Sequence, residues 1–197
     1  MANAPTHSPY LAVRQNWLYK APREAILEPD LPIVDPHHHL WEAGPTRAYG
    51  YLDEELSRDL DEGHRVVATV HVQCRNRYRS EGPEHLKPVG ETEWLEALAS
   101  RHAAQPGAPR IAAGIIGYAD LTLGDAVNEV LEAHLAASPS RFRGIRQMAA
   151  FNPHAQTNTA PFEHLLADAR FRRGLDCLSR RGLSFDVWVF HMQLPEV

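Results

Sequence analysis

Residues 33–41 read Ile-Val-Asp-Pro-His-His-His-Leu-Trp. The apolar start of this stretch predicts a buried strand, in which side chains alternate between the two faces of a sheet. His37 and His39 then point to one side and His38 to the other. Two neutral imidazoles in this arrangement can bind one cation such as zinc. The alternative is a His-rich surface loop, but the apolar residues on both sides favour the end of a buried element.

The composition is that of a soluble globular protein. The 197 residues are 44% hydrophobic and 23% charged, and the formal net charge of -5 argues against a general nucleic-acid surface. The two cysteines, Cys74 and Cys177, are too few for a disulfide framework and fit a reducing compartment. The first ten residues lack a signal-peptide pattern, and no apolar run approaches the ~20 residues that span a bilayer. We therefore expect a cytoplasmic protein without membrane or nucleic-acid partners.

Strand-like and helix-like segments alternate along the chain. We expect an N-terminal arm and lead-in over residues 1–31, with a short helix at 10–20, and one domain over residues 32–197. The predicted strands are residues 32–39, 65–73, 111–118, 142–148 and 183–190. The predicted helices are residues 52–62, 91–105, 125–137 and 161–181. This α/β alternation predicts a parallel sheet, either open and doubly wound or part of a (β/α)8 barrel.

Polar residues collect at the carboxyl ends of the predicted strands, the edge where α/β proteins carry their sites. They are His37, His39, His71, Gln73, Arg146, Gln147 and His191. With the first pair, His191 would complete three nitrogen ligands and leave one position open, as in catalytic zinc sites. Its alternative role is packing beside the aromatic residues that precede it. No Gly-rich phosphate loop follows the first strand, so a nucleotide site is not expected.

Three further residues are candidates for catalytic or substrate-binding roles. Arg146 ends a buried strand, so it needs a substrate carboxylate, a lactone carbonyl, or an internal ion pair with Glu91. Glu91 opens a predicted helix, where a carboxylate also interacts favourably with the helix dipole. Gln73 either hydrogen-bonds the substrate or closes its strand end. The arginines of loop 74–90 either attract an anionic substrate or form a solvated face.

Four segments together resemble the amidohydrolase superfamily. They are the stretch at 33–41, Gly-Glu-Thr-Glu-Trp at 90–94, Phe-Arg-Gly-Ile-Arg-Gln at 142–147 and Phe-His-Met-Gln-Leu-Pro at 190–195. The branch they resemble most is the amidohydrolase 2 group of TIM-barrel metal-dependent hydrolases. That branch includes sugar lactonases such as L-fuconolactonase, and 2-pyrone-4,6-dicarboxylate lactonase.

The resemblance implies a (β/α)8 TIM barrel in which His37, His39 and His191 bind metal and Arg146 contacts substrate. The implied activity is hydrolysis of a lactone of a sugar acid or small carboxylic acid, with a small, anionic substrate. The binuclear members carry a carboxylated lysine on the fourth strand, which has no lysine here. The resemblance therefore implies at most one divalent metal, zinc or manganese, and some lactonase relatives work with none. A homo-oligomer is compatible with this assignment.

Two alternatives stay open at this stage. Relatives in the superfamily also include non-oxidative decarboxylases of aromatic acids. The resemblance covers about the first five β/α units, without counterparts of a strand-six histidine and a strand-eight aspartate. The chain is then a truncated barrel, and a non-catalytic fragment is the second alternative. Because such an arc exposes two sheet edges and an apolar inner face, we expect poor solubility or a need for a partner.

Overall fold

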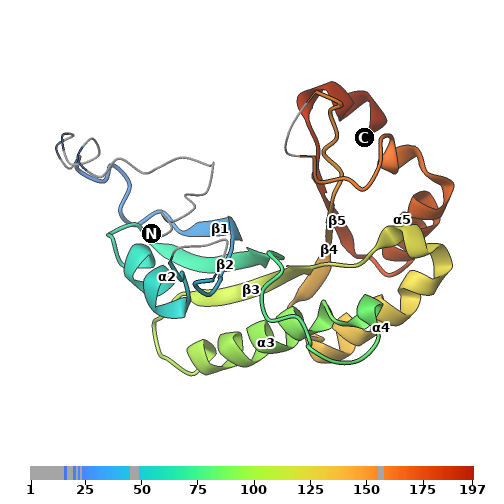
Figure 1. Ribbon diagram of the computed structural model, residues 1–197. Coiled ribbons are helices and arrows are strands. Elements are labelled where there is room, and N and C mark those ends of the chain that lie inside the picture. Colours follow the sequence, from blue (N-terminus) through green and yellow to red (C-terminus); the bar gives the residue numbers. More distant parts are fainter. Residues whose placement is uncertain (1–15, 17–19, 21, 23, 45–48, 155–157) are drawn as a thin grey trace, which may run out of the picture.

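The computed structural model describes residues 16, 20, 22, 24–44, 49–154 and 158–197. Its centre is one sheet of five parallel strands in the order β1-β2-β3-β4-β5 (Figure 1). Each strand pairs with the next one along the chain, so the order never reverses as it does in a doubly wound sheet. The chain therefore forms a curled half-barrel, a partial (β/α) TIM barrel. The strands are β1 (Ile33–His38), β2 (Val66–Val72), β3 (Arg110–Gly117), β4 (Phe142–Met148) and β5 (Ser184–Trp188).

Helices cover one face of the sheet, where α3 and α4 lie below it in Figure 1. The core between them is apolar and includes Leu95, Ile115 and Phe142. None of the helices in the described ranges is both long enough and apolar enough to cross a membrane. The α-helices are α2 (Asp53–Leu60), α3 (Val89–Ala103), α4 (Val127–Ala137) and α5 (Ala169–Arg180). Short 3-10 segments are η1 (Glu84–Leu86), η2 (Leu121–Ala126), η3 (Leu165–Ala167) and η4 (His191–Glu196).

The helix predicted over residues 161–181 is wrong in its first part. His164 has a left-handed backbone with φ 59°, and α5 begins only after Asp168. The Asp168 carboxylate accepts hydrogen bonds from the amides of Arg170 and Phe171, both at 2.9 Å. Aspartate at this position satisfies amides that a helix start otherwise leaves unpaired, so it fixes where the helix begins. The helix predicted over residues 10–20 lies almost entirely outside the described residues.

Both edge strands of the sheet expose apolar side chains. On β1, 54% of Val34 is exposed, and on β5, 47% of Trp188 is exposed. The inner strands are more buried, because each has a neighbour on both sides. The half-barrel thus has two open edges, which are surfaces that can pair with further strands.

A close approach between α5 and η2 depends on Gly174. A Cβ atom at this position would lie 2.3 Å from the carbonyl oxygen of Leu121. Because a backbone oxygen cannot move aside as a flexible side chain can, only glycine fits here. Glycine has a lower helix propensity than alanine, but at this position it allows α5 to pack closely against η2.

We expect Gly174→Ala to lower the free energy of unfolding by about 1–3 kcal/mol, although alanine is normally the better helix residue. Urea denaturation followed by circular dichroism measures this. Gly44→Ala is the control, because no atom of the described residues lies within 4 Å of its added Cβ, and its change should stay within about 0.5 kcal/mol. A Gly174→Ala variant as stable as the wild type would contradict the packing argument.

His134 of α4 is buried as a neutral imidazole with both ring nitrogens paired. Its Nδ1 lies 2.8 Å from Thr92 Oγ1, and its Nε2 lies 3.0 Å from the Tyr118 carbonyl oxygen. Its ring stacks on Phe142 at a centroid distance of 4.8 Å. Burial lowers the pKa of His134 from 6.5 to about 4. We interpret this histidine as structural, because the neutral ring forms a hydrogen bond at each of its two nitrogens.

The lowered pKa of His134 makes stability depend on pH. Between pH 6.5 and 4 the unfolded chain binds a proton that the folded chain does not, so stability falls as the pH falls. Going from pH 7 to 5, this group should remove about 2 kcal/mol. Urea midpoints of wild type and His134→Gln at both pH values test this. The variant should lose that much less stability over the interval; parallel losses would contradict the assignment.

Candidate active site

The predicted polar residues gather at the carboxyl ends of the parallel strands. In the register of the sheet His38 pairs with His71, so the ends of β1 and β2 lie beside each other. The pairing of β1 shifts between Asp35 and His38, where Pro36 has no amide to donate. Such irregularities redirect side chains and are common beside functional sites. The end of β1 is therefore shaped to present its histidines rather than to continue a regular ladder.

His37 and His39 lie next to each other, with their Nε2 atoms 3.2 Å apart. The Nδ1 of His39 donates to the carbonyl oxygen of Val72 at 2.7 Å, which leaves a lone pair on Nε2 of the neutral ring. The amide of His37 donates to Asp35 Oδ1 at 3.0 Å, so Asp35 supports the turn rather than joining the pair. His38 points to the other face, where its Nε2 lies 2.9 Å from Thr69 Oγ1. Burial lowers the pKa of His38 to about 4.

Arg146 of β4 extends toward the same place, although only 3% of it is exposed. Its Nη2 donates to the Gln73 carbonyl oxygen, and its Nη1 lies 3.4 Å from His37 Nε2. Its guanidinium carbon lies 5.8 Å above the ring of Trp188. Burial lowers the pKa of Arg146, but an arginine stays charged. No carboxylate within the described ranges forms an ion pair with it, so the internal pair with Glu91 is not formed.

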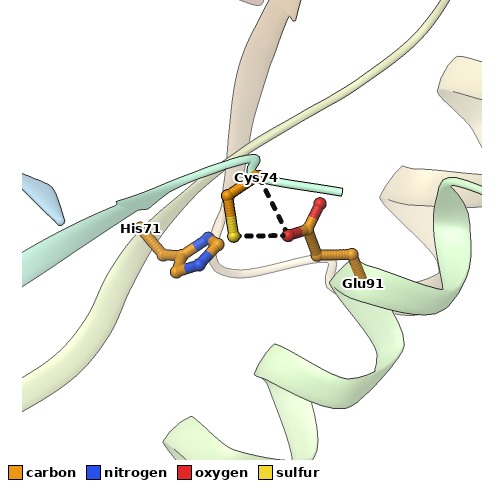
Figure 2. A group of neighbouring side chains, drawn as sticks. All are labelled: His71, Cys74 and Glu91. Atoms are coloured by element: carbon orange, nitrogen blue, oxygen red, sulfur yellow. Dashed lines mark hydrogen bonds between the residues drawn. The ribbon is translucent and has the colours of Figure 1, made fainter. Parts of the chain in front are cut away.

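Glu91, at the start of α3, is buried and holds the loop that follows β2 (Figure 2). Its Oε1 accepts from the amides of Cys74 at 3.0 Å and Asn76 at 3.2 Å, and the Cys74 sulfur lies 3.4 Å away. Burial raises the pKa of Glu91. The carboxylate thus anchors the loop amides, a role beyond the interaction with the helix dipole that the sequence suggested.

Cys74 is a site residue that the sequence analysis did not select, and His71 was noted there only as a polar residue at a strand end. Figure 2 shows them beside Glu91, with His71 on β2, Cys74 just past its end and Glu91 on α3. Ligand atoms of these three residues all lie within 4.8 Å of one another. Within the described residues no other group of three His, Cys, Asp or Glu meets this spacing, so His191 does not join His37 and His39 at that distance. His191 opens η4 and is exposed.

Buried polar atoms without a partner are concentrated at this edge. Both amide atoms of Gln73, the Tyr78 hydroxyl and Arg146 Nε belong to this group. Folded proteins pair almost all such atoms, so a cluster of them marks a place built to bind something polar. Across the described chain, all but two of these atoms belong to the strand ends or the adjoining loop and helix start: His38, His71, Gln73, Asn76, Tyr78, Glu91 and Arg146.

The loop arginines are partly used within the protein. Arg77 forms an ion pair with Glu42, and Arg79 forms one with Glu93. Arg77 also lies over the ring of Trp94 at 6.0 Å. These two arginines therefore hold the loop against α3 and the segment after β1, which favours the solvated-face interpretation for them.

Comparison with known proteins supports the fold. No family model matches the chain. It is 30% identical over 186 residues to an uncharacterized protein, y4mH, of Sinorhizobium fredii, and covers 57% of that protein and 85% of its own length. It also resembles the crystal structure of an amidohydrolase from Burkholderia multivorans with bound HEPES, at a TM-score of 0.57 and 24% identity. That match covers 83% of this chain and 50% of the other, so the chain spans about half of each relative.

We expect Glu91→Ala to lower the free energy of unfolding by about 2–4 kcal/mol, because it leaves buried loop amides unpaired. Glu91→Gln should cost clearly less, since its amide oxygen can still accept from Cys74 and Asn76. Chemical denaturation of both variants and the wild type gives the comparison. Equal losses in the two variants would show that the carboxylate does not anchor the loop as described.

Proposed function

We propose that this chain is part of a hydrolase of the amidohydrolase superfamily that opens the lactone of a sugar acid or small carboxylic acid. The observation that carries the proposal is the pair of Nε2 atoms of His37 and His39, 3.2 Å apart at the carboxyl end of a half-barrel strand. The structural likeness to an amidohydrolase supports the superfamily. The likeness covers half of that protein, and the activity of the whole enzyme is part of this proposal.

The chemistry of the pair fits a divalent metal such as zinc or manganese. Nitrogens that each lie about 2.0–2.1 Å from one zinc in tetrahedral geometry are roughly 3.3 Å apart, close to the spacing of His37 and His39. The carbonyl of Val72 holds His39 by its other nitrogen, the usual support for a metal-binding histidine. His191, just beyond β5, stays our proposed third ligand, and it would have to move toward the pair because it does not group with it in this structure. A bound divalent cation polarises a carbonyl and lowers the pKa of a bound water.

The remaining residues of the site bind and orient the substrate in this proposal. Arg146 offers a buried guanidinium without a carboxylate partner, suited to a lactone carbonyl or a substrate carboxylate. Gln73 offers a buried amide whose nitrogen and oxygen are both available. Glu91 sits beside them on α3 and keeps the loop after β2 in place. In this proposal none of these three residues activates the attacking water.

We expect the purified protein to hydrolyse members of a sugar-lactone panel, and His37→Ala or His39→Ala to lower kcat/KM by at least about 100-fold. Loss of a metal ligand removes a charge that stabilises the reacting carbonyl. His64→Ala is the control, because this residue is exposed and lies just before the amino end of β2, at the opposite edge of the sheet. Metal content, measured on the same preparations, should fall in the first two variants only.

Three outcomes of this assay would contradict the proposal. Unchanged turnover in His37→Ala would remove the role of the pair. Release of carbon dioxide from an aromatic-acid panel, with no lactone hydrolysis, would identify a decarboxylase instead. A folded, metal-free preparation that is silent on both panels would favour a non-catalytic fragment.

A further inference from the structure

We propose that His71, Cys74 and Glu91 form a second site, separate from the His37–His39 pair, for a thiophilic divalent cation of the zinc type. Ligand atoms of the three residues all lie within 4.8 Å of one another. Figure 2 shows the three side chains facing one another across the gap between the end of β2 and the start of α3. The site does not depend on the proposed hydrolase activity.

The donor set selects the class of cation. Imidazole and thiolate are soft enough to favour zinc over magnesium or calcium, and three protein ligands with one open position is a familiar zinc arrangement. A thiolate and a carboxylate together neutralise a divalent charge, so the loaded site carries no net charge. This matters because His71 is fully buried and only 2% of Glu91 is exposed. A neutral cluster avoids the large cost of burying a bare ion.

Two of the three residues have buried atoms that nothing in the described chain satisfies. His71 Nδ1 and Glu91 Oε2 are both without a hydrogen-bond partner. The carboxylate is also held in advance, because its Oε1 accepts from the amides of Cys74 and Asn76. Ligating carboxylates in metal sites are supported by outer hydrogen bonds in this way. The site therefore has an oriented carboxylate and buried polar atoms without a partner among the described residues.

Binding of a cation at this site changes the hydrogen bonds of the Leu40 backbone. His71 Nε2 accepts from the Leu40 amide at 3.2 Å, and the Cys74 thiol donates to the Leu40 carbonyl at 3.1 Å. Coordination through His71 Nδ1 moves the ring proton to Nε2, and coordination through Cys74 removes the thiol proton. Both contacts with Leu40 must then open. Because Leu40 directly follows His39, the second site is coupled to the end of β1.

The two cation sites are neighbours but use different atoms. The rings of His39 and His71 are 6.3 Å apart, centre to centre. His39 Nδ1 donates to the Val72 carbonyl, whereas His71 Nδ1 has no partner among the described residues. Only the second site contains sulfur. A probe that detects a metal–sulfur bond therefore distinguishes it from the His37–His39 pair.

The test is titration of chelator-treated protein with Co²⁺. A thiolate ligand gives cobalt a charge-transfer absorption in the near ultraviolet, which nitrogen and oxygen ligands do not give. We expect this band in the wild type, in His37→Ala and in Cys177→Ser, the matched control for the other cysteine. The band should be lost in Cys74→Ser and His71→Asn. No band in cobalt-loaded wild type, or a band that survives in Cys74→Ser or His71→Asn, overturns the proposal.

Circular dichroism on each preparation separates loss of the site from loss of the fold. Serine retains a donor for the Leu40 carbonyl, so Cys74→Ser should fold. Glu91→Gln is a second variant that keeps the loop amides bonded but removes the carboxylate charge. Its Co²⁺ affinity should be weaker by on the order of 10–100-fold. Unchanged affinity in a folded Glu91→Gln would also overturn the proposal.

Discussion

The candidate site depends on the hydrogen bonds by which β2 and the residues just beyond it hold the end of β1. The Val72 carbonyl binds His39, Thr69 binds His38, and His71 binds the amide of Leu40. These contacts are made by side chains or carbonyls rather than by a regular strand ladder, which is interrupted after Asp35. The positions of His38 and His39 are thus set by the neighbouring strand. Any change that moved the end of β2 would move the imidazoles as well.

The central part of the fold could be predicted from sequence because its signals are local. Apolar runs identified the strands, and the predicted strand at 142–148 coincides with β4. The alternation of strands and helices predicted a parallel sheet but left two architectures open. The choice between them depends on which strands pair, and pairing is a long-range property. The sequential order of the five strands decides it.

The candidate site was less predictable, for physical reasons that differ between residues. The facing of His37 and His39 follows from the two-residue period of a strand, which the sequence displays directly. The cluster of Glu91 with Cys74 requires α3 to return over the end of β2, and its only sequence signal is a weak His-x-x-Cys spacing. The absence of an Arg146–Glu91 ion pair depends on Glu91 using its carboxylate for loop amides. No residue pattern distinguishes those two uses of a buried carboxylate.

The strictly sequential pairing of the sheet has a consequence for how the protein forms during translation. Each strand finds its partner in the segment synthesised immediately before it, so no pairing has to wait for a distant part of the chain. Short sequence separation between contacting segments speeds folding, and domains fold from the N-terminal side as the ribosome releases them. The histidine-bearing strand and the strand that holds it are also the first two to emerge. The arrangement of these histidines is thus assembled early, and the following β/α units are added by growth at a single advancing edge.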